Sequence, residues 1–555
     1  MKKYGLLFLA FFIAAFASAQ EEEKIVLPEI TTTVSGDSLV AGKEAVPDFS
    51  EIVPPAKDAS PLPKLPGVQT GTYEDEPIAD FSVLSEKTLY AQGLIGAGIP
   101  GYFTGDFSIY KTSGSEPFSL KFSHESLEGY GKHDAAEGYF DSNTRLEGKK
   151  TFAWKNAELK LSALYDSLKY GLQDKSKSFY DLTGRTASFG TEVKWKLPND
   201  FYAGTSLGAE WYSRSAGIPK SSSKDWTFSQ EQETDVTFFN PSVFAGWKND
   251  SVDINLMLTY ENEVLWGGDK LSSAGLSYNS DADVFSVNKF DAELSFAWTY
   301  SFFKLGISGG VVAGNNIGDN PALPQFKLST EFNFEAGEEK LPVSIKVSGG
   351  VDSHLEKLSD FEKNFLFTSQ IFLPWETTDL FAKAELSIPI GSRIVLDADT
   401  TFRKTVFDNG VWEADYLAPA VTSLYGAEQI ERSVLCSNAK LSFAWKIFTV
   451  NISWKNNLLH VASNEYSNYL GGALSFQSSD ASWGFNAGVY EAVGDDVDLC
   501  PVLNAEIFYR LKDSIRLACE MEDAIKLISR SDRDYGESLY IKKSGSAKIL
   551  VRFFF

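Results

Sequence analysis

Residues 252–260 read Val-Asp-Ile-Asn-Leu-Met-Leu-Thr-Tyr, and apolar side chains occupy every second position of this stretch. Residues 448–455, which read Phe-Thr-Val-Asn-Ile-Ser-Trp-Lys, repeat the alternation. A period of two is typical of a β-strand that has one apolar and one polar face. From residue 88 onward we count about 22 such segments of roughly 9–13 residues, a length that suits tilted strands crossing a bilayer. The sequence therefore predicts an all-β chain.

A recurrent tryptophan distinguishes a membrane barrel from a soluble β-sandwich, which would show the same alternation. Five tryptophans stand just before short turns, four of them followed by lysine: Trp154, Trp195, Trp247, Trp298 and Trp445. Tryptophan prefers the membrane interface, and a lysine beside it can reach the lipid headgroups. Other connections, such as 218–231, are long and polar. Short turns on one side and long loops on the other are typical of outer-membrane barrels, so we expect these tryptophans to form a lipid-facing girdle at the periplasmic rim.

The last nine residues, 547–555, read Ala-Lys-Ile-Leu-Val-Arg-Phe-Phe-Phe. Their apolar face includes the residues that we predict to act as an assembly signal: Ile549, Val551, Phe553 and Phe555. This pattern resembles the closing strand that the barrel-assembly machinery recognises. We therefore expect residues 88–555 to form one transmembrane antiparallel β-barrel in the outer membrane of a Gram-negative-type (diderm) bacterium, in contact with outer-membrane lipid.

The N-terminal residues differ from the rest. Lys2 and Lys3 precede an apolar run, 6–16, and Ala17-Ser18-Ala19 supplies small residues for cleavage, so residues 1–19 are expected to be a signal peptide. The alternative is a membrane anchor, but the run is shorter than the ~20 residues that span a bilayer. Eight of the 20 prolines fall in residues 20–87. Because proline cannot donate to a sheet, we expect this segment to be a disordered periplasmic tail.

Two stretches resemble the barrel of TonB-dependent receptors. Residues 515–555 look like the last hairpin of that family, and residues 118–172 resemble its first strands. Residues 24–34 are similar to a TonB box, the short strand that pairs with TonB. The resemblance implies a transport barrel that engages TonB, or another periplasmic protein, through Ile25, Val26, Leu27 and Ile30. The alternative for this segment is a plain tethering tail.

The sequence departs from that family in one respect. The family carries a plug domain of well over a hundred residues between box and barrel, whereas only residues 34–87 are available here, and no plug motif is visible. About fifty proline-rich residues are too few to form a domain with its own core. We therefore expect an unplugged barrel whose lumen is narrowed by its own long loops or by a partner.

Several function classes are disfavoured. The net charge of −24 argues against a nucleic-acid partner, which needs a basic footprint. The three cysteines and four histidines show no metal-ligand spacing, and we expect no cofactor. His124 and Ser126 share a strand face, as the His-x-Ser pair of outer-membrane phospholipase A does, but no third group can be assigned to orient the imidazole. We therefore expect no enzyme.

Two functions remain open. Charged residues such as Lys160, Asp166 and Asp253 alternate with apolar ones, and this pattern favours a polar, water-filled lumen. The first hypothesis is an outer-membrane channel or transporter for small polar solutes. The alternative is a structural or adhesive outer-membrane protein, such as a subunit of an envelope complex, without a transport role.

Overall fold

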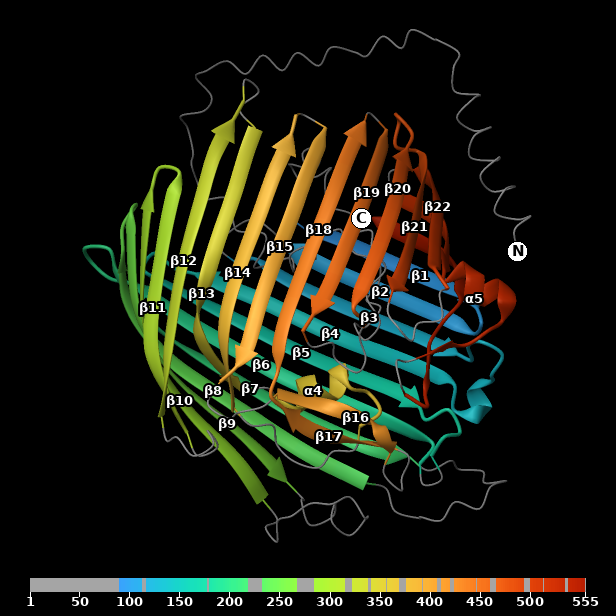
Figure 1. Ribbon diagram of the computed structural model, residues 1–555, viewed down its shortest axis with the longest axis horizontal. Helices are drawn as coiled ribbons and strands as arrows, with labels where there is room; N and C mark the ends of the chain where they lie inside the picture. The colour runs from blue at the N-terminus through green and yellow to red at the C-terminus, as the bar shows by residue number, and fades with distance from the viewer. Residues whose placement is uncertain are drawn as a thin grey trace. The chain divides into compact units, whose positions relative to one another are not determined.

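The chain folds into a closed antiparallel β-barrel (Figure 1). The structure, a computed structural model, describes residues 89–554 except 112–115, 177–178, 218–231, 267–283, 315–321, 338–340, 356, 369–375, 392, 407–410, 420–423, 446, 460–465, 494–499, 513 and 535–537. Within these described ranges, 22 strands form a single sheet, and each wall strand pairs with its neighbours along the chain. The last wall strand pairs with the first, with Gln92 opposite Phe554 and Ile99 opposite Ala547. The predicted fold class and strand number are therefore confirmed.

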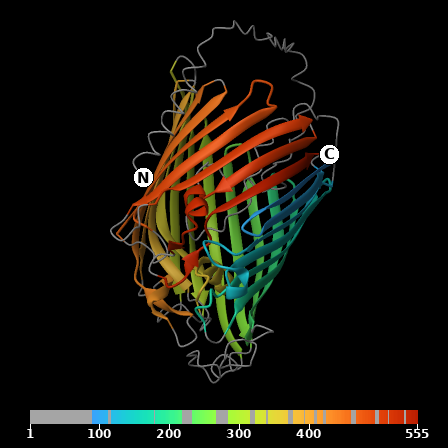
Figure 2. The ribbon, with the colours of Figure 1, turned by 90° about the vertical axis from the view of Figure 1, so that its right-hand side faces the viewer.

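The first half of the wall consists of β1 (Tyr90–Ile99), β2 (Tyr102–Lys111), β3 (Phe118–Glu128), β4 (Phe140–Ala153), β5 (Ala157–Gly171), β6 (Asp181–Lys196), β7 (Phe201–Gly217), β8 (Gln232–Lys248), β9 (Val252–Trp266), β10 (Val284–Tyr300) and β11 (Phe303–Gly314). The second half consists of β12 (Ala322–Ala336), β13 (Leu341–Leu355), β14 (Glu376–Ile390), β15 (Ile394–Thr405), β18 (Ser433–Trp445), β19 (Phe448–Leu458), β20 (Asn468–Gln477), β21 (Trp483–Val493), β22 (Val502–Lys512), β23 (Ile515–Glu522) and β26 (Ser546–Phe554). The wall strands are tilted, as Figure 2 shows.

The two rims of the barrel differ in the length of their connections. The rim where β26 ends carries the short turns 112–117, 154–156, 197–200, 249–251, 301–302, 337–340, 391–393, 446–447, 478–482 and 513–514. The opposite rim carries the longer connections 129–139, 172–180, 218–231, 267–283, 315–321, 356–375, 406–432, 459–467, 494–501 and 523–545, as well as the tight turn 100–101. We call these the short-turn rim and the long-loop rim. The asymmetry expected from the sequence is present.

The two faces of the wall differ in polarity. In β9 the side chains of Ile254, Leu256 and Tyr260 are exposed on the outside, whereas Asp253 and Asn255 alternate with them on the lumen face. Exposed apolar residues recur in the same way on the outer face of β1, β6, β10, β12, β19 and β22. A soluble protein rarely exposes so continuous an apolar surface, whereas a lipid-facing barrel wall requires one.

The backbones of the first and last strands approach each other closely at Gly98. A Cβ atom added to Gly98 in β1 would lie 2.0 Å from the carbonyl oxygen of Ala547 in β26. Any residue larger than glycine would therefore push the first and last strands apart at the seam.

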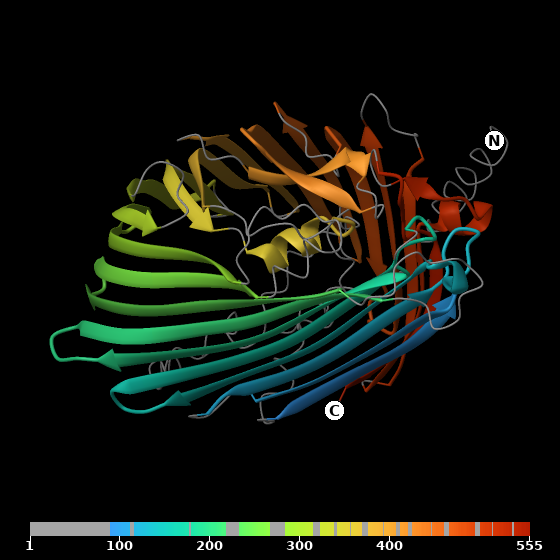
Figure 3. The same cartoon turned by 90° about the horizontal axis from the view of Figure 1, so that it is seen from below.

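Small elements stand in the long connections. They are η2 (Ala135–Glu137), α4 (Leu358–Asn364), β16 (Val411–Pro419), β17 (Tyr425–Ile430), α5 (Ala524–Ser529), β24 (Arg533–Asp534) and β25 (Ile541–Lys542). Seen along the barrel, α4 and the β16–β17 hairpin lie inside the ring of strands (Figure 3). None of the helices in the described part of the chain is long and apolar enough to cross a membrane. The expected signal peptide 1–19 and tail 20–87 lie outside the described residues.

Candidate functional site in the barrel lumen

In the connection between β13 and β14, α4 lies inside the lumen and not beyond the rim (Figure 3). Leu358, Phe361 and Phe365 follow one another at helical spacing, so α4 has an apolar face. That face is buried against lumen-facing side chains near the long-loop rim, with Leu358 and Phe361 only 2% exposed. The wall residues of this apolar core are Tyr170, Leu182, Tyr212, Ala216, Val236, Leu265 and Val287. Burying each large apolar side chain stabilises the docked segment by about 1.5–3 kcal/mol.

The N-terminal end of α4 is held by carboxylates of the wall. The backbone N–H of Leu358 donates to Glu263 Oε1 on β9 at 3.0 Å, and the Ser359 hydroxyl donates to Glu210 Oε1 on β7 at 2.7 Å. The Lys357 ammonium lies 3.2 Å from Glu210 Oε2 and 4.3 Å from the ring centre of Phe238. The first N–H groups of a helix lack intrahelical partners and favour negative charge, so these carboxylates complete the start of α4.

A buried ion pair fixes the middle of α4. Arg214 Nη1 on β7 lies 2.7 Å from Glu362 Oε1, and the two side chains are 6% and 2% exposed. The Tyr212 hydroxyl also donates to Glu362, while Arg214 Nη2 donates to the carbonyl oxygen of Thr368 at 2.6 Å. Burial raises the pKa of the Glu362 carboxyl above its ordinary value, while Arg214 and Tyr212 oppose that shift. Desolvation of such a buried pair offsets much of its electrostatic attraction. We therefore attribute the stability of docked α4 to apolar burial, and its position on the wall to the ion pair.

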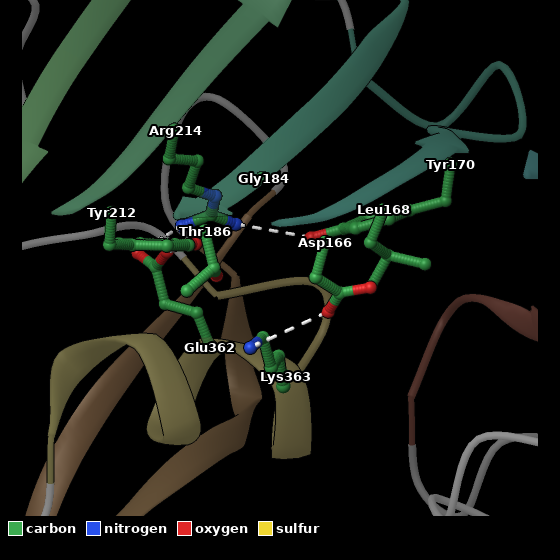
Figure 4. A pocket seen from close by; sticks show the side chains of 9 residues that line it. All are labelled: Asp166, Leu168, Tyr170, Gly184, Thr186, Tyr212, Arg214, Glu362 and Lys363. Carbon is green, nitrogen blue, oxygen red and sulfur yellow. Dashed lines mark hydrogen bonds and ion pairs between the residues drawn. The ribbon is translucent and has the colours of Figure 1, made fainter. Parts of the chain in front are cut away.

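A small pocket lies between α4 and the wall (Figure 4). Its polar lining comes from Asp166, Thr186, Arg214, Glu362 and Lys363, among others. The Lys363 ammonium lies 3.6 Å from Asp166 Oδ2. Asp166 Oδ1 is buried and has no hydrogen-bond partner. The pocket therefore contains a carboxylate oxygen that can accept a further hydrogen bond.

Two further connections join α4 inside the lumen. In the connection 406–432, the Tyr425 N–H donates to the carbonyl oxygen of Phe367 at 2.8 Å, and the Tyr425 side chain is 1% exposed. In the connection 523–545, the Tyr540 ring stacks on that of Phe367 with centroids 3.8 Å apart, and the Leu539 N–H donates to the Tyr425 hydroxyl at 2.6 Å. We call residues 357–368, 411–419, 424–430 and 538–545 the lumen cluster.

The lumen cluster links opposite parts of the wall. The connection 406–432 leaves the wall between β15 and β18, whereas α4 and Phe367 pack on β5, β7, β8 and β9. In a ring of 22 strands, β15 and β18 stand across from β4 and β5, and β5 is one of the strands on which α4 packs. The cluster therefore crosses the lumen and narrows it near the long-loop rim.

The connection 523–545 has its own charged anchor on the wall strands β3 and β4. Lys543 Nζ lies 3.0 Å from Glu125 Oε1 on β3 and 3.8 Å from Asp141 Oδ2 on β4. Although burial alone would lower it, the pKa of Lys543 is raised above its ordinary value by the Asp141 and Glu125 carboxylates. Lys543 therefore ties the third part of the lumen cluster to the wall through two carboxylates.

All five predicted girdle tryptophans lie at the short-turn rim. Each belongs to the outward-facing set of its strand or stands in the turn that follows it, and Trp154, Trp195, Trp298 and Trp445 are exposed. Trp247 is half-buried, and its indole N–H donates to the carbonyl oxygen of Asn199 at 3.1 Å. That these residues contact lipid headgroups stays a prediction.

The other predicted site residues have two outcomes. Ile549, Val551 and Phe553 share the outer face of β26, with Ile549 65% exposed, whereas Phe555 lies outside the described residues. Recognition of this face by the assembly machinery stays a prediction. The proposed partner strand, Ile25, Val26, Leu27 and Ile30, also lies outside the described residues.

Neither a catalytic pair of His124 and Ser126 nor a metal site gains support from the geometry. His124 Nδ1 lies 2.8 Å from the hydroxyl oxygen of Thr144, and its ring is near that of Phe103 on the outer face. This contact gives the imidazole a hydroxyl neighbour, where a catalytic Ser–His pair uses a carboxylate or amide to orient it. Among the described residues, no group of three or more His, Cys, Asp or Glu side chains could hold a metal ion.

Comparisons with known proteins support the same fold. No protein-family model and no curated protein sequence matches the chain. Among solved structures, the siderophore receptor PirA from Acinetobacter baumannii matches with a TM-score of 0.63 and 7% identity, over 84% of this chain and 81% of that chain. The FrpB iron transporter from Neisseria meningitidis matches with a TM-score of 0.60 and 10% identity, over 86% and 82%. The ferric enterobactin receptor PfeA from Pseudomonas aeruginosa matches with a TM-score of 0.59 and 9% identity, over 84% and 80%. The resemblance to TonB-dependent receptors predicted from the sequence is therefore confirmed for the barrel fold.

Proposed function

We propose that this protein is an outer-membrane transport channel for small polar solutes, and that the lumen cluster controls their passage. The observation that carries the proposal is the cluster itself, which crosses a polar lumen and is docked on the wall by buried contacts. A barrel that served only as a structural anchor or adhesin would not need residues that cross and narrow its lumen.

The proposal includes a direction of control. Residues 357–368 enter from the long-loop rim, so we propose that the closed state is set from that side and not by a separate plug domain. The matched structures are named for siderophores, ferric enterobactin and iron, and those names describe the cargo of those proteins. For this chain, the alternation of lysines with carboxylates on the lumen face favours small polar solutes.

The N-terminal segments complete the proposal. We propose that residues 20–87 remain periplasmic after removal of residues 1–19. Residues 24–34 would add a strand to the sheet edge of TonB or of another periplasmic protein, because strand addition needs only an extended β-prone segment.

Osmotic swelling of liposomes tests the channel directly. The full chain is compared with a variant in which residues 357–368 are replaced by a Gly-Ser linker of equal length, using arabinose and raffinose as solutes. We expect wild-type protein to admit arabinose, and the variant to admit both sugars several-fold faster, because the docked segment no longer narrows the lumen. Swelling no faster than that of protein-free liposomes for both proteins would reject transport and favour the structural or adhesive alternative.

A further inference from the structure

Three carboxylates from alternate strands share one region of the lumen wall. They are Asp166 of β5, Glu210 of β7 and Glu263 of β9, and we call them the acidic wall patch. The neighbouring cation on the same wall, Arg214, is committed to Glu362 of α4 at 2.7 Å. The patch is therefore a group of acidic side chains whose ion pairs, among the described residues, are made with residues 357–363 and not with the wall.

The groups that neutralise the patch come from one short segment of the lumen cluster. Lys357 lies 3.2 Å from Glu210, and Lys363 lies 3.6 Å from Asp166. The backbone N–H of Leu358 donates to Glu263 at 3.0 Å. Residues 357–363 thus present two ammonium groups and one neutral N–H donor to three acidic side chains. A bound diamine would likewise present two ammonium groups.

An aromatic ring completes the cation site. The Lys357 ammonium stands 4.3 Å from the ring centre of Phe238, which is buried on β8 between the strands that carry Glu210 and Glu263. A carboxylate beside an aromatic face is a general arrangement for binding amines, since the ring quadrupole attracts a desolvated cation.

The patch also has acceptor atoms that residues 357–363 leave unused. Asp166 Oδ1 and Glu263 Oε2 are buried without hydrogen-bond partners, in side chains that belong to residues only 6% and 1% exposed. A carboxylate can accept several hydrogen bonds, and a buried acceptor without a donor is destabilising. A ligand with more N–H donors than this segment would satisfy both atoms.

We infer that the acidic wall patch is a recognition site for solutes with two or more amino groups, and that residues 357–363 occupy it as an internal substitute for such a solute. Polyamines and short dibasic peptides have the required chemistry. A solute of this class competes with Lys357 and Lys363 for the same carboxylates and displaces α4. This inference rests on the proposed function, since it names the substrate class of the same lumen.

Calorimetric titration of spermidine into the full chain in detergent micelles tests the inference. The variant Lys357→Ala/Lys363→Ala vacates the patch, so we expect it to bind spermidine at least tenfold more tightly than wild type. Adding Glu210→Gln and Asp166→Asn should weaken binding at least tenfold again. Glu385→Gln is the matched control: this carboxylate on β14 pairs with Lys346 of β13 and Lys383 of β14, not with α4, and its loss should leave binding unchanged. N-acetylated spermidine should bind more weakly than spermidine.

Several outcomes would overturn the inference. Equal spermidine affinity in wild type and in Lys357→Ala/Lys363→Ala would do so, as would binding that survives Glu210→Gln with Asp166→Asn. If the double variant fails to fold, Lys363→Ala alone gives the same comparison, because its ion pair is the longer of the two. Swelling assays on the same protein separate the two proposals. Carboxylate-dependent binding without transport keeps the site and rejects the channel, whereas transport without binding keeps the channel and rejects the site.

Discussion

At the residue scale, the contact between Arg214 and Glu362 decides how α4 is placed. The two residues are 148 positions apart in the sequence, one on the wall and one in a connection. A buried ion pair adds little net stability, because the cost of desolvating both charges offsets their attraction. Removing one partner, however, leaves an isolated buried charge. The pair therefore selects one docked position for α4 among those that apolar packing alone would allow.

Arg214→Met should weaken the docking of α4 by about 3–5 kcal/mol, because Glu362 is left buried without its partner. Hydrogen exchange of the backbone amides of residues 358–368, followed by mass spectrometry, should become correspondingly faster. The double variant Arg214→Met/Glu362→Leu should recover most of the protection. Arg516→Met is the control, since its buried partner Glu506 lies on the neighbouring wall strand and not on α4. Unchanged exchange in Arg214→Met would show that the pair does not hold the segment.

At the element scale, the wall strands and α4 differ in how far the sequence predicts them. Alternation over residues such as Ile254, Leu256 and Tyr260 predicts β9 because the side-chain period of a strand is local. The same logic predicts the outward set of β26. Leu358 and Phe361 of α4, with Phe365 directly after it, follow a helical pattern, and that spacing was the available sign of a buried element within a polar connection.

The position at which α4 docks on the lumen wall could not be predicted from the sequence. Its partners Glu210, Arg214 and Glu263 read simply as polar positions on a strand face, since nothing in their spacing distinguishes them from the other lumen-facing charges. Likewise, the stacking of Tyr540 on Phe367 joins two connections that are distant in the chain. Such contacts depend on barrel closure, which brings connections together around the ring.

The closing strand supplies the element-scale prediction. Ile549→Asp places a charge on the outer face of β26, whereas Arg552→Asp changes the lumen face of the same strand. A lysine or arginine facing lipid costs about 2–4 kcal/mol near the membrane centre and an aspartate costs less, but the aspartate also interrupts the apolar pattern that we propose to direct assembly. Ile549→Asp should therefore accumulate in the periplasm, while Arg552→Asp reaches the outer membrane. Fractionation of expressing cells distinguishes these outcomes, and normal membrane levels of Ile549→Asp would contradict the proposed assembly signal.

At the scale of the whole molecule, the barrel combines an apolar exterior, a polar interior and the lumen cluster that crosses this interior. The lumen cluster draws on three connections of the long-loop rim: α4 is anchored to the wall through Arg214 and the connection 523–545 through Lys543, while Tyr425 joins the β16–β17 hairpin to Phe367. Release of one anchor should therefore loosen the constriction without unfolding the wall, whose strands are paired around a closed ring.

Single-channel recording in planar lipid bilayers tests the central claim most directly. We predict that wild-type protein conducts mainly in brief openings, that Arg214→Met carries a several-fold larger time-averaged current, and that Arg516→Met behaves like wild type. The reason is that Arg214 joins the wall to the lumen cluster, whereas Arg516 pairs with Glu506 on the neighbouring wall strand. Identical currents from wild type and Arg214→Met, or no current from either, would contradict control of passage by the lumen cluster.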